Sequence, residues 1–149
     1  MEKNEYKITI NAPREKVWET LWNDATYRAW TAPFSADSHA KTDWQQGSKV
    51  LFLDGNGNGM ASTIAENRPN EFMSIRHLGV VKNGVEDYDS EESKKWGNGF
   101  ENYTLKSVPG GTELVVDMGA DSIPAEYKDY FAQTWPKALN KLKELAESN

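Results

Sequence analysis

The amino-acid sequence predicts an α+β protein in which an antiparallel β-sheet packs against one long C-terminal helix. Between residues 38 and 119, apolar residues alternate with polar ones and turn residues separate the alternating stretches, which is typical of strands that follow one another directly. Between residues 127 and 146, apolar residues recur every three or four positions, which is typical of an amphipathic helix. The apolar face of such a sheet must be covered, and a helix of about 24 residues, about 36 Å long, can cover it.

The N-terminal segment predicts one strand followed by two short helices. Three apolar residues between positions 6 and 10 alternate with polar residues, so they share one face of a strand. Pro13 suits the first position of a helix, where its missing N–H would have no partner, and apolar residues continue at helical spacing to Trp22. A second short helix is predicted over residues 25–30, before Pro33.

The middle of the chain predicts a meander that brings the total to about six or seven strands. Its strands are predicted at residues 49–54, 60–66, 72–81, 100–108 and 112–118. Residues 84–97 combine five carboxylates with two lysines and lack apolar alternation, so a solvated loop is predicted there. No repeat or linker divides the chain, and we expect residues 1–149 to form a single domain.

The C-terminal helix carries two prolines that affect its prediction. Pro124 lies at its expected start, where proline is tolerated. Pro136 lies inside the pattern, where it removes a hydrogen bond to residue 132. The apolar stripe continues in phase beyond Pro136, so we expect one helix with a kink near residues 132–136 rather than two helices.

Composition restricts the classes of function. The absence of Cys excludes disulfides, thiolate metal sites and a cysteine nucleophile. A net charge of −6 disfavours nucleic acid and anionic membranes as partners. No apolar run approaches the roughly 20 residues of a spanning helix, and the first residues lack the apolar core of a signal peptide, so we expect a soluble, cytoplasmic protein without membrane insertion. The six Trp, six Tyr and five Phe either fill a core or line a cavity.

Local motifs do not predict a metal or a cofactor. Residues 54–59 match the first six positions of an EF-hand calcium loop, but position twelve, which needs a bidentate carboxylate, is Ala65. A hairpin turn explains this Asn- and Gly-rich segment better. His39 and His77 are the only histidines and are not spaced as a metal pair, and no serine lies in a GxSxG motif. We therefore expect no metal, no cofactor and no recognisable catalytic motif.

His77 and Tyr103 are the polar residues that alternation places on inward strand faces. His77 shares a face with Ile75, and Tyr103 shares one with Leu105. A polar ring on an inward face either pairs with a neighbouring group or serves as one of the few polar anchors of an apolar pocket. The sequence leaves both interpretations open.

Five features of the sequence together resemble a known family. They are ITINAPREKVW at residues 8–18, Trp30, DWQQGS at residues 43–48, the hairpin YTLKSVPGGTEL at residues 103–114, and WPKALNKL at residues 135–142. They resemble the START-like (SRPBCC, polyketide cyclase and birch-pollen-allergen-like) superfamily. Within it, the chain is most similar to the proteins related to the activator of heat-shock protein 90 ATPase, over about residues 5–147. The five features are turn and core residues, so they are markers of architecture rather than of activity.

This resemblance implies the helix-grip fold, in which a curved antiparallel sheet wraps a long C-terminal helix and two short helices close one end. Members of the superfamily bind lipids, sterols, hormones and polyketides in a cavity between helix and sheet, and a few are cyclases or hydrolases. The resemblance carries over no catalytic residue. The cavity-lining positions that it implies here are Trp30, Phe34, Phe52, Met60, Ile64, Ile75, His77, Tyr103, Leu114, Phe131 and Trp135.

Three functions follow from these observations as hypotheses. The first is the binding of a small apolar or aromatic, lipid-like molecule in the cavity, without catalysis. The second is an interaction module that contacts a chaperone or another protein through the acidic residues 86–92. By resemblance, the chain corresponds to the C-terminal module of the eukaryotic co-chaperone. The motif that stimulates the ATPase lies in that protein's separate N-terminal domain, so the resemblance does not carry ATPase activation over to this chain. The third is an enzyme that uses His77 as general base and Tyr103 as hydrogen-bond donor.

Overall fold

The computed structural model describes residues 5–96, 99–118 and 127–148. Four helices and eight strands are formed by these residues. In chain order they are β1 (Glu5–Ile10), α1 (Arg14–Trp22), α2 (Asp24–Thr31), β2 (His39–Lys41), β3 (Lys49–Leu53), β4 (Gly59–Arg68), β5 (Phe72–Lys82), β6 (Val85–Asp87), α3 (Glu91–Trp96), β7 (Phe100–Val108), β8 (Gly111–Asp117) and α4 (Lys128–Glu147).

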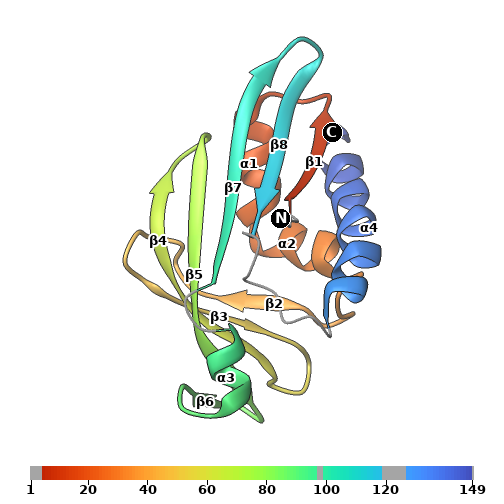
Figure 1. The fold of residues 1–149 in the computed structure, drawn as a ribbon. Coiled ribbons are helices and arrows are strands. Elements are labelled where there is room, and N and C mark those ends of the chain that lie inside the picture. The colour runs from red at the N-terminus through yellow and green to blue at the C-terminus, as the bar shows by residue number, and fades with distance from the viewer. Residues whose placement is uncertain (1–4, 97–98, 119–126, 149) are drawn as a thin grey trace.

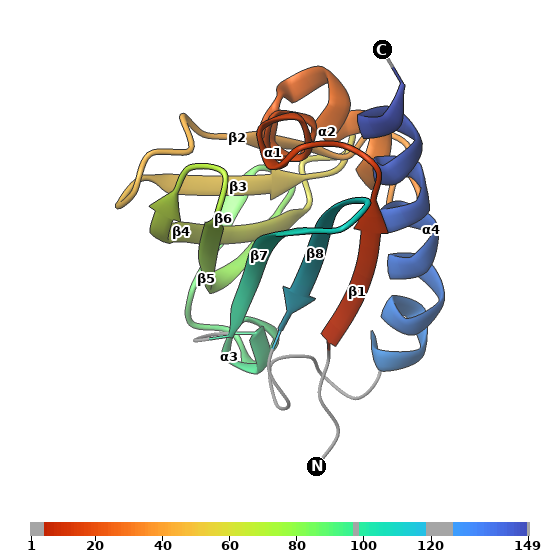
Figure 2. The same cartoon turned by 90° about the horizontal axis from the view of Figure 1, so that it is seen from above.

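The strands form one antiparallel sheet in the order β1-β8-β7-β5-β4-β3-β2, with β6 paired to β5. The sheet curves, so that β3 and β2 run across the end of the molecule where α1 and α2 lie (Figures 1 and 2). This confirms the predicted helix-grip fold. The structure has eight strands where the sequence predicts six or seven, because β2 and β6 contain three residues each and are too short for alternation to reveal.

Helix α4 lies along the sheet beside β1 (Figure 2). Its buried residues form the predicted stripe, from Thr134 and Trp135 to Ala146. Trp135 stacks on Tyr6 of β1, with ring centroids 5.8 Å apart and an angle of 19° between the planes. The helix is continuous through Pro136, as predicted; the kink stays a prediction, and Pro124 lies outside the described residues.

Helices α1 and α2 pack on each other at one end of the sheet. Helix α1 begins at Arg14, one residue later than predicted, so Pro13 precedes the helix instead of being its first residue. Asn23 starts α2 by accepting a hydrogen bond from the Ala25 N–H at 3.0 Å. The Trp30 indole N–H donates to the Leu21 carbonyl at 3.1 Å, and this bond fixes α2 against α1.

The segment 84–97 is not only the solvated loop that the sequence predicts, because it contains β6 and α3. Local side-chain hydrogen bonds start the helix: Asp87 Oδ1 accepts the Ser90 N–H at 3.1 Å, and Ser90 Oγ accepts the Ser93 N–H at 3.1 Å. Ser93 Oγ in turn accepts the Val80 N–H of β5 at 3.2 Å. These polar contacts replace the apolar periodicity on which the prediction depended.

Residues 54–59 form the predicted hairpin turn between β3 and β4, where Leu53 pairs with Gly59. Gly57 has a φ of +79°, which glycine adopts without strain. Asp54 Oδ1 accepts the N–H groups of Asn56 at 2.8 Å and Asn58 at 3.0 Å. Within the described ranges, no cluster of three or more His, Asp or Glu residues could hold a metal ion.

Among the described helices, none is both long enough and apolar enough to cross a bilayer. The longest is α4, in which lysines and glutamates alternate with the buried stripe.

Candidate functional site

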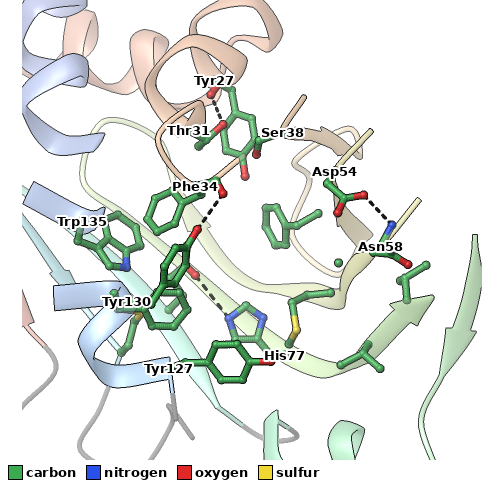
Figure 3. A pocket seen from close by; sticks show the side chains of 18 of the residues that line it. Tyr27, Thr31, Phe34, Ser38, Asp54, Asn58, His77, Tyr127, Tyr130 and Trp135 are labelled. Atoms are coloured by element: carbon green, nitrogen blue, oxygen red, sulfur yellow. Dashed lines mark hydrogen bonds and ion pairs between the residues drawn. The ribbon is translucent and has the colours of Figure 1, made fainter. Parts of the chain in front are cut away.

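A cavity of about 770 Å³ lies between the sheet, the end of α2 and the start of α4 (Figure 3). Aromatic side chains contribute to its wall from all three sides. Tyr27, Trp30 and Phe34 come from α2 and the segment after it, Phe52 and Tyr103 come from β3 and β7, and Tyr127, Tyr130, Phe131 and Trp135 come from the start of α4.

Eight of the eleven residues implied to border a cavity line this one. They are Trp30, Phe34, Phe52, Met60, His77, Tyr103, Phe131 and Trp135. The other three, Ile64, Ile75 and Leu114, do not border it and are buried in the hydrophobic core. Ile64 pairs directly with Ile75 across β4 and β5, beyond an irregularity in the register between Ala61 and Ser62.

The reason for this difference is that alternation predicts a face of a strand but not a position along it. Ile64 and Ile75 occupy the inward face of the sheet where it is filled by side chains, whereas His77, two residues after Ile75, lies where it is hollow. Leu114 pairs with Ile8 of β1 and Leu105 of β7 and is also buried in the core.

Further residues that sequence reasoning did not identify also line the cavity, among them Tyr27, Glu101 and Tyr130. Tyr27 lies three residues before Trp30, and this helical spacing indicates only that both residues pack on the same side of a helix. A signal for Glu101 was present, because it lies two residues before Tyr103 and therefore on the same face of β7.

His77, Glu101 and Tyr103 form the polar end of the cavity, and the buried Ser62 contacts His77. Ser62 Oγ lies 2.7 Å from His77 Nδ1, and His77 Nε2 lies 3.5 Å from Glu101 Oε1. The Tyr103 hydroxyl donates a hydrogen bond to Glu101 Oε2. An ionised carboxylate accepts only, so His77 presents Nε2–H to Glu101 and, when neutral, accepts at Nδ1 from the Ser62 hydroxyl.

Burial and the Glu101 carboxylate together raise the pKa of two tyrosines in the cavity. Burial is the larger cause for both Tyr27 and Tyr103, and the negative charge of Glu101 adds to it. Because the pKa of each hydroxyl lies well above its ordinary value of 10.0, both tyrosines stay protonated at neutral pH and act as hydrogen-bonding groups.

This geometry suits orientation of a ligand better than nucleophilic attack. Ser62 is fully buried and does not line the cavity, so its hydroxyl is not presented to a molecule bound there. His77 has a polar group facing each ring nitrogen. His77 and Tyr103 approach the same carboxylate from different sides, His77 at Oε1 and Tyr103 at Oε2.

The acidic residues of the interaction hypothesis have structural partners. Glu86 binds Lys49 at 2.8 Å, Glu92 binds Lys82 at 2.5 Å, and Asp87 starts α3. Folding therefore explains three of the five carboxylates in residues 86–92, which weakens the argument that the charge cluster exists for a partner protein.

Tyr130 connects the two sides of the cavity, because its hydroxyl donates to the Phe34 carbonyl at 2.8 Å (Figure 3). We expect Tyr130→Phe to lower the free energy of unfolding by about 1 kcal/mol, since the ring contacts remain and one hydrogen bond is lost. Urea unfolding measures this. Tyr88→Phe is the matched control, because Tyr88 is equally exposed and its hydroxyl donates to Glu86, only two residues away. Equal, negligible effects of both variants would contradict the connection.

Asp54 at the cavity rim predicts a pH dependence. The backbone N–H groups of Asn58 and Asn56 hold the pKa of this carboxyl below its ordinary value of 3.8. Its contribution to stability is therefore present above pH 3.8 and is lost as the pH falls through the lower, folded-state pKa. NMR titration of the Asn56 and Asn58 amides should give a midpoint below 3.8; a midpoint at or above it would show that the turn does not favour the charged carboxylate.

Comparison with known proteins gives one family and a set of similar folds. Residues 11–147 match the family model described as "Activator of Hsp90 ATPase homolog 1-like protein". A search of curated proteins finds no match.

Solved structures of similar fold come from several bacteria. Protein MLL2253 from Mesorhizobium loti is 18% identical with a TM-score of 0.73, over 97% of this chain and 96% of that one. The solution structure of the Aha1 dimer from Colwellia psychrerythraea is 18% identical with a TM-score of 0.71, over 99% and 97%. Protein CV1439 from Chromobacterium violaceum is 21% identical with a TM-score of 0.68, over the whole of both chains. At these identities the likeness shows the fold alone.

Proposed function

Since the chain belongs to the family of activator of Hsp90 ATPase homolog 1-like proteins, we propose that it binds a small apolar or aromatic molecule in the cavity between its sheet and α4. The observation that carries the proposal is an aromatic-lined space of about 770 Å³. Ligand pockets have volumes of roughly 300–1,000 Å³ and are lined mainly by apolar side chains around a few polar groups.

The wall supplies the driving force for such binding. Each Å² of apolar surface that a ligand removes from water contributes about 25 cal/mol. Phe34 and Trp135 meet edge to face, with centroids 5.1 Å apart, and Trp135 also contacts Trp30 and Tyr103. These mutual contacts hold the rings in place before a ligand enters. Less side-chain conformational entropy is therefore lost when a ligand binds.

The polar end supplies orientation. His77, Glu101 and Tyr103 lie together in the wall, beside the aromatic residues that line it. A molecule with one polar end and an apolar body would place its polar end there, because a buried polar group needs a hydrogen-bond partner.

Native mass spectrometry of the gently purified protein and tryptophan fluorescence test this proposal. Trp30 and Trp135 line the cavity, so their emission should change as a ligand displaces water from it. The titration panel consists of fatty acids, flavonoids, sterols and naphthalene derivatives. Saturable binding with one site per chain supports the proposal; no binding by any member, together with no co-purified molecule, would overturn it.

A further inference from the structure

We propose that the ligand of this cavity is a cationic amphiphile, an aromatic or aliphatic molecule whose protonated amine binds Glu101. The inference rests on the proposed binding function and adds the chemical class of the ligand. It depends on the contacts of Glu101, on the other charged groups of the cavity and on the aromatic wall.

Glu101 presents a carboxylate with spare hydrogen-bonding capacity to the cavity. Its side chain is 18% exposed, and it is one of the lining residues. Tyr103 donates to Oε2, and His77 lies 3.5 Å from Oε1. A carboxylate has about four acceptor positions, so these two partners leave room for a further donor.

The positive groups that line the cavity are already committed to carboxylates. Of the lining residues in the described parts of the chain, Lys82 is the only Lys or Arg, and it binds Glu92 at 2.5 Å. His77 can carry positive charge, but its Nε2 faces Glu101 itself. A ligand carboxylate or phosphate would therefore find no free cation in the cavity wall. It would also be repelled by the negative charge of Glu101, which would weaken its binding.

The aromatic wall favours the same sign of charge. The face of an aromatic ring carries partial negative charge and attracts ammonium groups within about 6 Å. The Tyr103 ring, two residues along β7 from Glu101, contacts Trp22 and Trp135, and Tyr27 lies close enough to Glu101 for its pKa to respond to that charge. Rings and carboxylate together form a setting for an ammonium group at the end of an apolar body.

Three probes with one ring system test the inference. Naphthylethylamine, naphthylacetate and naphthylethanol differ at the polar end only, and isothermal titration calorimetry at pH 7.5 measures their affinities. We expect the amine to bind at least about tenfold more tightly than the acid, and the affinity of the alcohol to lie between the two. Glu101→Gln should remove this preference and weaken amine binding by about tenfold, with little effect on the alcohol.

Glu15→Gln is the matched control, because it removes the same charge from an exposed position on α1. It should leave all three affinities unchanged, and thermal unfolding of both variants checks that each is folded. If no probe binds but a fatty acid, flavonoid or sterol does, the inference about charge is overturned and the binding function stands. If none of these molecules binds, the proposed binding function itself fails. If the probes bind but the acid equals or exceeds the amine, or Glu101→Gln leaves the preference intact, the inference about charge is overturned while the binding function stands.

Discussion

Val80→Trp is expected to weaken binding of the naphthyl probes by about tenfold or more, because the indole occupies space that the ligand needs. Phe52, Met60 and Val80 pair in a row across β3, β4 and β5, and all three line the cavity. Val80 lines the cavity and is only 4% exposed, so we expect a larger side chain at this position to take up space in the cavity. A ligand that loses about 60 Å² of apolar contact loses about 1.5 kcal/mol, or about tenfold in Kd.

Val85→Trp is the control for this substitution. Val85 lies on β6, paired with Lys82 of β5, and is 67% exposed outside the cavity. The same change there should leave affinity unaltered. A second check comes from ligand size: Val80→Trp should penalise naphthyl probes more than phenyl ones. Equal affinities for the wild-type protein and Val80→Trp would mean that the probes bind elsewhere.

Leu114→Ala is expected to lower the free energy of unfolding by about 2–5 kcal/mol and to leave ligand affinity within about threefold of wild type. Leu114 is fully buried between Ile8 and Leu105 and does not line the cavity. Truncation therefore creates a new void in the packed core, which lowers the free energy of unfolding more than truncation at a partly exposed position does.

Urea unfolding and calorimetry measure the two quantities on the same protein. Leu78→Ala, at a half-buried position of β5, removes the same atoms and should cost clearly less stability. A small loss of stability in Leu114→Ala combined with altered ligand affinity would place Leu114 at the cavity, as the family resemblance implies, and would contradict the structure.

Periodicity in the sequence predicts an antiparallel sheet covered by a long C-terminal helix, and the family resemblance implies that these elements form a helix-grip fold. The apolar stripe of α4 continues in phase through Pro136, and the helix is continuous there. Helix α3 could not be predicted in this way, because Asp87, Ser90 and Ser93 start it by hydrogen bonds that leave no apolar pattern.

The family resemblance implies several of the aromatic residues that line the cavity. It does not tell which inward-facing residues lie in the core instead, or that the Glu101 carboxylate lines the cavity. Alternation places Ile75 and His77 on one face, and only the folded sheet shows that the first lies in core and the second at the cavity. Glu101 follows from the same alternation as Tyr103, but a carboxylate on an inward face is costly without partners. Its partners His77 and Tyr103 become visible only when β5 and β7 pair.

The central claim is that the space between sheet and α4 receives the ligand, and intermolecular NOEs test it most directly. In a complex of methyl-labelled protein with naphthylethylamine, we expect NOEs from the naphthyl protons to the methyl groups of Met60 and Val80, which line the cavity, and none to those of Leu114. A bound probe with NOEs to exposed methyls such as those of Val85, and none to Met60 or Val80, would contradict the account.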